Sequence, residues 1–205
     1  MTYIFAILAV LISIAAFQNR VLFDKLKFNA YAIKHHRQFY RFLSHGFVHG
    51  GWAHLLFNML VLISFGRIVE NSFQQIWGNT LGGFYFIVLY VGGLVISSAP
   101  SYFKNQDNEY YNAVGASGAI SSVLFASILF DPWSKIYIIF IPIGIPAFIF
   151  GALYLIFSAY MAKKGTDNIG HDAHFWGAIF GLAYTIILKP PLFTRFLELI
   201  TMVNG

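Results

Sequence analysis

The chain has 205 residues, of which 58% are hydrophobic and 10% are charged, and its formal net charge is +5. Soluble domains are roughly half apolar and a quarter charged, so this composition excludes an ordinary soluble domain and indicates a polytopic membrane protein. The absence of Cys excludes disulfides and thiolate metal sites. The positive charge needs no nucleic-acid partner, because membrane proteins carry Lys and Arg at the lipid headgroups.

Six apolar stretches are predicted as membrane spans within a single domain that covers residues 1–205, and the first and the fourth of them are short against the about 20 apolar residues that cross a bilayer core. These stretches are 3–17, 51–69, 80–99, 115–130, 136–161 and 173–188. Pro142, Gly144 and Pro146 are expected to bend the fifth. Residues 18–50 mix basic and aromatic side chains, which favours a folded connection in the membrane interface. The sequence therefore predicts an all-α bundle with a long interfacial first loop.

The second, fourth and sixth spans run in the same direction, so the depths of their polar residues can be compared. Each ends at a charged residue, and helices rise ~1.5 Å per residue. Counting back from those ends places His54, Ser117 and His174 at one depth, ~20 Å from the far surface. Asn58 lies one turn after His54 on the same helix face. Ionisable residues inside a membrane are costly and are functional candidates by default.

Ser117 can be either a helix-packing residue or a nucleophile, and a neighbouring base decides which. His174 is the leading candidate for that base, because Gly177 and Gly181 follow it on the same helix face. Small residues at this spacing let membrane helices approach closely, and the expected partner is the small face of the fourth span around Gly118. A serine attack also needs donors for the oxyanion.

Three groups near Ser117 could donate to that oxyanion: its own backbone N–H, the amide of Asn58 and the ring of His54. Asp172 lies only two residues before His174, and we interpret it as a helix cap rather than as a triad acid. The histidines could also suggest a metal site, but there is no H-E-x-x-H motif and no carboxylate deep in a span. No metal and no cofactor is therefore predicted.

Several motifs, taken in their order along the chain, resemble the rhomboid family of intramembrane serine proteases. They are Tyr40-Arg41, His45, His49, His54 to Asn58, Glu70, Gly115-Ala116-Ser117-Gly118 and Ala173-His174-Phe175-Trp176-Gly177. The resemblance implies six spans, a Ser117–His174 dyad without an acid, and an oxyanion hole made by His54, Asn58 and the Ser117 N–H. The implied substrates are single-span membrane proteins, cut in or near their transmembrane segment.

The resemblance also implies structural support around this site. The supporting residues are Tyr40, Arg41, His45, His49, Glu70, Gly115, Gly118, Gly177 and Gly181. Two positions depart from the family pattern, which usually has Trp in place of Tyr40 and an aromatic residue in place of Ser121, packed under the catalytic histidine. Another aromatic side chain, Phe175 or Trp176, is expected to take over that support.

The membrane and its sidedness follow from the resemblance too. The Lys and Arg of the first loop favour a cytoplasmic location for it, whereas the family places that loop and the mouth of the site outside the cytoplasm. We follow the family and expect a bacterial cytoplasmic membrane with the site opening to the extracytoplasmic side. Two other functions stay open: an inactive rhomboid-like protein that binds membrane clients, and a proton-relaying channel or transporter, against which the lack of intramembrane carboxylates counts.

Overall fold

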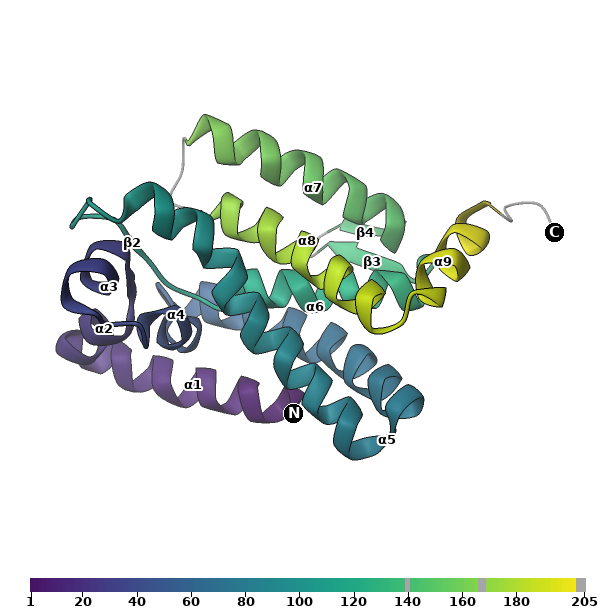
Figure 1. Ribbon diagram of the computed structural model, residues 1–205, viewed down its shortest axis with the longest axis horizontal. Coiled ribbons are helices and arrows are strands. Elements are labelled where there is room, and N and C mark those ends of the chain that lie inside the picture. The colour runs from purple at the N-terminus through teal and green to yellow at the C-terminus, as the bar shows by residue number, and fades with distance from the viewer. Residues whose placement is uncertain (139–140, 166–168, 202–205) are drawn as a thin grey trace.

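The computed structural model describes residues 1–138, 141–165 and 169–201, and helices make up most of this part of the chain (Figure 1). The helices are α1 (Thr2–Gln18), α2 (Arg20–Leu26), α3 (Ala30–His36), α4 (Arg41–Ser44), the 3₁₀ turn η1 (His45–Phe47), α5 (Trp52–Asn105), α6 (Ser117–Phe130), α7 (Ala147–Lys164), α8 (His171–Leu188) and α9 (Pro191–Thr201). Four short strands depart from the all-α expectation: β1 (Phe28–Asn29), β2 (Asn112–Ala113), β3 (Lys135–Ile138) and β4 (Ile141–Pro146).

Helix α6 lies in the middle of the bundle, between α5 on one side and α8 on the other (Figure 1). Every residue from Gly118 to Leu129 is buried. A helix that is apolar all round is expected to be enclosed by other helices, and α6 ends at Asp131, directly before Pro132, which cannot continue it. The serine of the Gly-Ala-Ser-Gly run is thus the first residue of the central helix.

The expected second and third spans form one long element, α5, in which the chain doubles back (Figure 1). The break falls at Gly78, which has a φ of 79°, so the two arms are 52–77 and 79–105. A Cβ at Gly82 would lie 2.5 Å from the Phe73 carbonyl oxygen, which shows how tightly the arms meet. Residues 70–77, which lie between the predicted second and third spans, are helical as well.

The lengths of the described helices do not by themselves give six spans. Among these helices, α5 and α7 are long and apolar enough to cross a membrane, and α8 with α9 would make a third candidate if this pair, bent by 113°, is one span. Helices α1 and α6 are apolar but shorter. The count of six therefore stays a prediction that depends on reading α5 as two spans and accepting two short ones.

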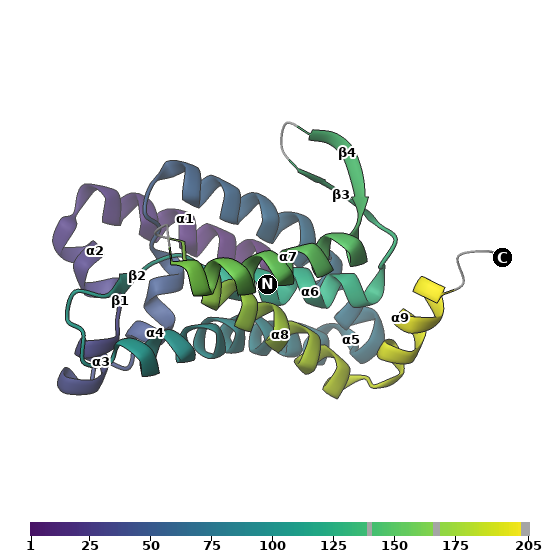
Figure 2. The ribbon, with the colours of Figure 1, turned by 90° about the horizontal axis from the view of Figure 1, so that it is seen from above.

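The start predicted for the fifth span, residue 136, is wrong. Strands β3 and β4 pair as an antiparallel hairpin that projects from the bundle (Figure 2), and the helix begins only at Ala147. Residues 139–140 of the predicted span lie outside the described residues. The segment is rich in Ile, which favours strands, and its prolines cannot donate the hydrogen bonds of a helix interior. Pro142, Gly144 and Pro146 therefore lie in a strand instead of bending a helix.

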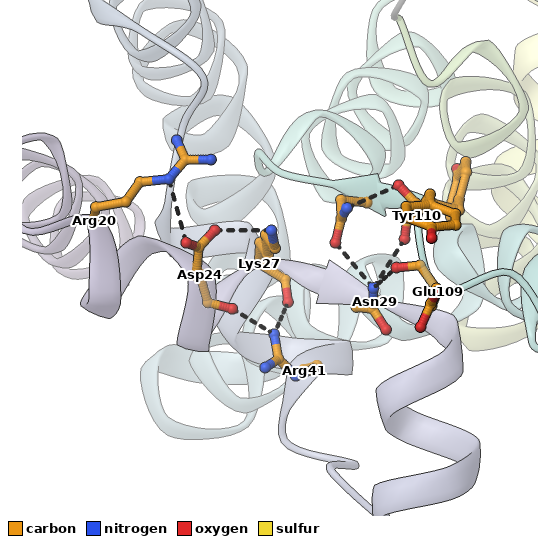
Figure 3. A network of polar contacts seen from close by, with 9 residues as sticks. Arg20, Asp24, Lys27, Asn29, Arg41, Glu109 and Tyr110 are labelled. Atoms are coloured by element: carbon orange, nitrogen blue, oxygen red, sulfur yellow. Dashed lines mark hydrogen bonds and ion pairs between the residues drawn. The ribbon is translucent and has the colours of Figure 1, made fainter.

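The connection 18–50 is folded, as the sequence predicts, and its place in the interface stays a prediction. Strand β1 pairs with β2, with Phe28 opposite Ala113 and Asn29 opposite Asn112. This pairing fastens the connection to the segment that leads into α6. The Asn29 amide adds hydrogen bonds to the carbonyl oxygens of Glu109, at 2.9 Å, and Tyr111, at 3.3 Å (Figure 3).

Candidate active site

Helices α6 and α8 touch through their backbones. A Cβ at Gly177 would lie 2.1 Å from the carbonyl oxygen of Gly118, and one at Gly181 would lie 2.1 Å from that of Ser122. The Ser122 hydroxyl donates to the carbonyl oxygen of Gly177 at 2.8 Å across this contact. Close approach through small residues is a common way for membrane helices to pack. The glycines singled out in the sequence do meet, and side chains larger than hydrogen do not fit there.

This contact brings the start of α6 to the level of His174. A Cβ at Gly118 would lie 3.4 Å from the carbonyl oxygen of Ala173, so Ser117, which precedes Gly118, and His174, which follows Ala173, lie at the same end of the α6–α8 pair. Both side chains are half-buried, whereas the rest of α6 up to Leu129 is buried. Ser117 is therefore the point at which the central helix becomes accessible.

Gly115 places two polar side chains beside the segment that leads into Ser117. Its φ is +106°, a conformation that favours glycine. A Cβ there would lie 2.7 Å from Nε2 of His54 and 3.5 Å from Nδ2 of Asn58. Any larger residue would collide with these groups. The backbone before the serine thus runs directly against the histidine and the asparagine that the sequence placed at its depth.

Both of these side chains offer hydrogen-bond donors. Nδ2 of Asn58 is buried and has no acceptor within the part of the chain that the structure describes, which is unusual because buried polar groups are normally paired. Nδ1 of His54 accepts a hydrogen bond from the Gly50 N–H at 3.4 Å, so the neutral ring carries its proton on Nε2, the atom that faces Gly115. The arrangement leaves two donors beside the start of α6.

His45 and His49 support this arrangement from the first connection. The carbonyl oxygen of His45 accepts a hydrogen bond from the Gly115 N–H at 2.9 Å. Nδ1 of His49 lies 2.9 Å from the Ser13 hydroxyl, and its ring meets that of His54 edge to face at 5.1 Å. Burial lowers the pKa of His45 to about 4 and that of His49 to about 3. Both rings are therefore neutral structural groups at physiological pH.

The described residues contain no group of three His, Asp or Glu side chains that could hold a metal ion. The histidines of the site instead make the ring contacts and hydrogen bonds given above.

Arg41 fastens the first connection internally. Its guanidinium donates to the carbonyl oxygens of Asp24, at 2.9 Å, and Lys27, at 2.6 Å (Figure 3). The Arg41 guanidinium carbon also lies 5.6 Å from the ring centroid of Tyr40, whose hydroxyl donates to the Lys25 carbonyl oxygen at 3.2 Å. Arg41 is buried among these acceptors. These contacts hold the turns that carry His45 and His49 toward the site.

Glu70 lies in the first arm of α5 and anchors the start of α1. Its carboxylate accepts hydrogen bonds from the Thr2 N–H at 2.9 Å and from the Thr2 hydroxyl at 2.8 Å. A Cβ at Gly66, one turn earlier, would lie 2.8 Å from the Thr2 side chain, so the two helices are in close contact there. Glu70 thus takes no direct part in the group around Ser117.

Asp172 is not the cap of α8, because the residue in the N-cap position is Gly170. The carboxylate lies in the first helical turn, where it accepts a hydrogen bond from the Ala173 N–H at 2.9 Å and another from the Ser101 hydroxyl. Tyr111 donates its hydroxyl to the same serine at 3.0 Å. The prediction of a cap is wrong by two residues. Asp172 instead links α8 to the end of α5.

His174 meets the ring of His171 edge to face at 5.9 Å, and the ring stacked on it comes from α7, which the sequence reasoning missed. The Tyr154 ring stacks on that of His174 with a centroid distance of 6.1 Å and an interplanar angle of 29°. Its hydroxyl lies 2.7 Å from the hydroxyl of Ser121, the residue at which the chain departs from the family pattern. The expected replacements are not this ring: Phe175 and Trp176 pack on each other, and Trp176 is exposed. The only signal for Tyr154 in the sequence was a hydroxyl-bearing ring within an apolar helix.

The comparisons with known proteins fit this geometry. A family model described as the rhomboid domain matches residues 36–191, more than half of the chain. The chain belongs to the rhomboid family. It is 35% identical over 142 residues to the "Presenilin-associated rhomboid-like protein, mitochondrial" of Rattus norvegicus and of Homo sapiens, a match that covers 67% of this chain and 35% of each relative.

A more distant rhomboid relative is the "RHOMBOID-like protein 12, mitochondrial" of Arabidopsis thaliana, which is 25% identical over 159 residues, covering 72% of this chain and 46% of that protein. The chain thus matches about a third to a half of the length of these relatives. Their names place them in mitochondria, so they give the expected bacterial cytoplasmic membrane no support. The part of the prediction that the comparisons support is an integral membrane protein of the rhomboid family.

Proposed function

We propose that the protein is an intramembrane serine endopeptidase that cleaves single-span membrane proteins in or near their transmembrane segment. The observation that carries this proposal is the buried Nδ2 of Asn58, which has no acceptor in the described part of the chain and lies against the loop that enters Ser117. A donor kept buried without a partner is a costly feature in an apolar protein. A transient oxyanion would give it the acceptor that it lacks.

The proposed reaction begins when His174 takes the proton of the Ser117 hydroxyl and the serine oxygen attacks the scissile carbonyl carbon. The negative charge on the former carbonyl oxygen is then bound by Nδ2 of Asn58, Nε2–H of His54 and the Ser117 N–H. That N–H belongs to the first turn of α6, where backbone donors have no partner within the helix. His174 returns the proton to the leaving amine, and water hydrolyses the acyl-enzyme by the same route.

The proposed substrate class is the one that the rhomboid resemblance implies, and the location of the site supports it. Ser117 is the first residue of the central helix, and the segment that leads into it is fastened to the connection 18–50 by the strand pair β1–β2 and by the hydrogen bond from the Gly115 N–H to the His45 carbonyl oxygen. A peptide bond within an intact helix has its carbonyl hydrogen-bonded and shielded, so a transmembrane substrate must unwind locally to reach the serine. Small residues that weaken the helix favour this step. We place the mouth of the site at the end of the bundle that carries the connection 18–50.

Reconstitution with a model single-span substrate tests the proposal. The wild type is expected to cleave the substrate, and Ser117→Ala and His174→Ala are each expected to lose nearly all of the activity, by at least about 10³-fold, because nucleophile and base act as a unit. Ser127→Ala is the matched control, since this buried serine of the same helix bonds within its own turn, to the Leu124 carbonyl oxygen. His36→Ala serves in the same way as an exposed histidine.

Other outcomes of this experiment discriminate the alternatives. Cleavage that survives Ser117→Ala contradicts the dyad. A wild type that binds single-span proteins but cleaves none of a panel supports the client-binding function instead. A proton flux through vesicles that is unaffected by substrate supports a channel or transporter.

A further inference from the structure

We propose that Tyr154 is a positioning residue for His174 and that Ser121 holds it in place. This inference rests on the proposed function and assigns a role to a residue outside the dyad and its oxyanion donors. A base that works without a neighbouring carboxylate needs something else to fix its ring. In this protein, the ring stacked on His174 at 29° is that of Tyr154.

The Tyr154 ring is itself held firmly. Its hydroxyl is bonded to the Ser121 hydroxyl at 2.7 Å, and its ring also meets those of Phe125, at 5.6 Å, and Phe150, at 5.9 Å. Ser121 lies one turn after Ser117 on the buried helix α6. The histidine on α8 is therefore connected through a ring on α7 back to the helix that carries the nucleophile.

Helix α7 turns one narrow face toward the bundle. Its buried residues are Ala147, Gly151 and Ser158, and side chains such as Leu153, Ile156 and Phe157 are exposed. Gly151, Tyr154 and Ser158 follow at helical spacing, so they lie on the single face that α7 turns toward the bundle. Tyr154 is the residue of that face that reaches the candidate site.

The contact serves the chemistry in two ways. Stacking restricts rotation of the imidazole, which keeps one nitrogen directed at Ser117. When His174 takes the proton, the resulting cation lies near the face of the tyrosine ring, whose π electrons favour it. Tyr154 thus acts through the histidine and does not touch the substrate.

Three substitutions distinguish the effect of the Tyr154 ring on kcat from that of its hydroxyl. Tyr154→Leu removes the ring and is expected to lower kcat about 10²-fold, as misplacement of a catalytic group by about 1 Å does. Tyr154→Phe and Ser121→Ala keep the ring and lose only the bond, so each is expected to lower kcat about threefold to tenfold. The double variant is expected to match either single one, since they remove the same interaction. KM is expected to change less than twofold throughout.

Two controls keep the result specific. Tyr160→Leu changes a tyrosine of the same helix that is 59% exposed and is expected to leave kcat unchanged. Ser121→Tyr combined with Tyr154→Ala moves the ring to α6, into the space vacated beside the histidine, and is expected to recover at least tenfold of the lost rate. Wild-type kcat in a folded Tyr154→Leu, or equal losses in Tyr154→Leu and Tyr160→Leu, overturns the proposal.

A readout independent of cleavage distinguishes failure of this inference from failure of the proposed function. Reaction of His174 with diethylpyrocarbonate, mapped by mass spectrometry, is expected to accelerate severalfold in Tyr154→Leu and not in Tyr160→Leu. If the wild type cleaves no substrate but this difference is found, the proposed function fails and the positioning of the ring stands. An unchanged rate of modification in Tyr154→Leu overturns the positioning.

An independent observation at the opposite end of the bundle carries a second inference. A hollow of about 360 Å³ lies between the first arm of α5, the end of α6 and the turn from α8 to α9. Its polar lining consists of Ser72, Gln75, Lys189 and Arg195, and its apolar lining consists of Ile76, Phe130, Pro191 and Leu192. We call it the basic hollow, and no carboxylate is among its lining residues.

The basic hollow lies where lipid phosphates are expected. It is at the end of α6 opposite Ser117, ~20 Å along a helix of 14 residues, and thus near the other surface of the bilayer core. Helix α9 turns by 113° from α8, and the Trp133 side chain holds it by donating to the Leu199 carbonyl oxygen at 2.9 Å. Basic pockets between helices at this level bind anionic headgroups.

We propose that the basic hollow binds the phosphate of an anionic phospholipid, with Lys189 and Arg195 as the charged contacts. The protein is mixed with equal amounts of phosphatidylglycerol and phosphatidylcholine and the bound lipid is measured by native mass spectrometry. The wild type is expected to retain phosphatidylglycerol about 10- to 30-fold better than phosphatidylcholine, because two cations near a membrane surface attract an anionic lipid by about this factor. Lys189→Gln with Arg195→Gln is expected to lose this preference. Lys163→Gln with Lys164→Gln, at the end of α7, is expected to keep it.

Two results overturn this assignment. The first is equal retention of phosphatidylglycerol by the two double variants, which would mean that the lipid is held elsewhere. The second is displacement of the lipid by millimolar inorganic phosphate, which would mean that the hollow takes a free anion.

Discussion

Helix α6 meets α8 and α7 in opposite ways. Against α8 the contact is between backbones, at Gly118 with Gly177 and at Ser122 with Gly181, and it leaves no room for a Cβ. Against α7 the contact is made by side chains, above all the Tyr154 hydroxyl on Ser121, while much of α7 is exposed. We infer from this difference that α8 sets the distance of His174 from Ser117, whereas α7 sets the orientation of the His174 ring.

The largest effect is expected where the backbones touch. Gly177→Ala would place a Cβ 2.1 Å from the Gly118 carbonyl oxygen, and because backbone cannot yield as a side chain does, the helices must separate. We expect a loss of about 3 kcal/mol or more in the free energy of unfolding, together with loss of cleavage. Thermal unfolding in detergent and a cleavage assay measure both. Gly83→Ala is the matched control, because the nearest atom to its Cβ would be 4.0 Å away, and equal behaviour of the two variants would contradict the close contact.

The next effect concerns the donor beside the serine. Asn58→Ala removes Nδ2 without filling its space, and we expect kcat to fall about 10²- to 10³-fold with little change in KM, as for the loss of one oxyanion donor. Asn79→Ala, an exposed asparagine of the same α5, should have no effect. Steady-state cleavage in proteoliposomes gives both parameters. A kcat within threefold of wild type would remove Asn58 from the proposed oxyanion hole.

The buried histidines of the first connection predict a loss of stability in acid. The pKa of His45 is lowered to about 4 and that of His49 to about 3 by burial, while an unfolded histidine has a pKa of about 6.5. Between these values the unfolded chain binds protons that the folded chain does not. The contribution of these two histidines to the free energy of unfolding is therefore complete above about pH 6.5. It falls as the pH is lowered toward 4 to 3, by at most about 1.4 kcal/mol per pH unit for each histidine.

Chemical unfolding followed from pH 8 to pH 4 measures this slope. His49→Gln should flatten it, and His36→Gln, which changes an exposed histidine, should leave it as in the wild type. A stability that does not change over this range, or that rises in acid, would show that these histidines are not buried as neutral groups.

The smallest effect is expected at the hydroxyl that spans the α6–α8 contact. Ser122→Ala loses the hydrogen bond to the Gly177 carbonyl oxygen but leaves the backbone contact in place. We expect a loss of about 1 kcal/mol in the free energy of unfolding and a cleavage rate within about threefold of wild type. If Ser122→Ala abolished cleavage as completely as Gly177→Ala, the hydroxyl rather than the shape of the glycine face would hold the helices together.

The sequence predicted the residues that gather at the start of α6 because their depth follows from the helical rise and from where each span ends. Membership of the rhomboid family is confirmed, and the contact of Gly118 with Gly177 has the form that their spacing predicted. The catalytic roles stay proposals. Tyr154 could not be predicted, because helical rise fixes the depth of a residue but a uniformly apolar span gives no clue to which face turns inward.

The β3–β4 hairpin was missed for a related reason. From Ile136 on its residues are apolar, so hydropathy joined them to the helix that begins at Ala147. The abundance of Ile around Gly144, with a proline at position 146, was the available signal for a strand. Asp172 shows the same limit on a smaller scale, since an acidic residue near a helix start fits both the cap and the first turn.

The central claim is that Ser117 is a nucleophile made reactive by His174. A fluorophosphonate probe that modifies activated serines, followed by mass spectrometric mapping of the adduct, tests it without any assumption about the substrate. We predict an adduct on Ser117 in the wild type, and labelling at least about 10²-fold slower in His174→Ala. An adduct on a different serine, or labelling of Ser117 at the same rate without His174, would contradict the account.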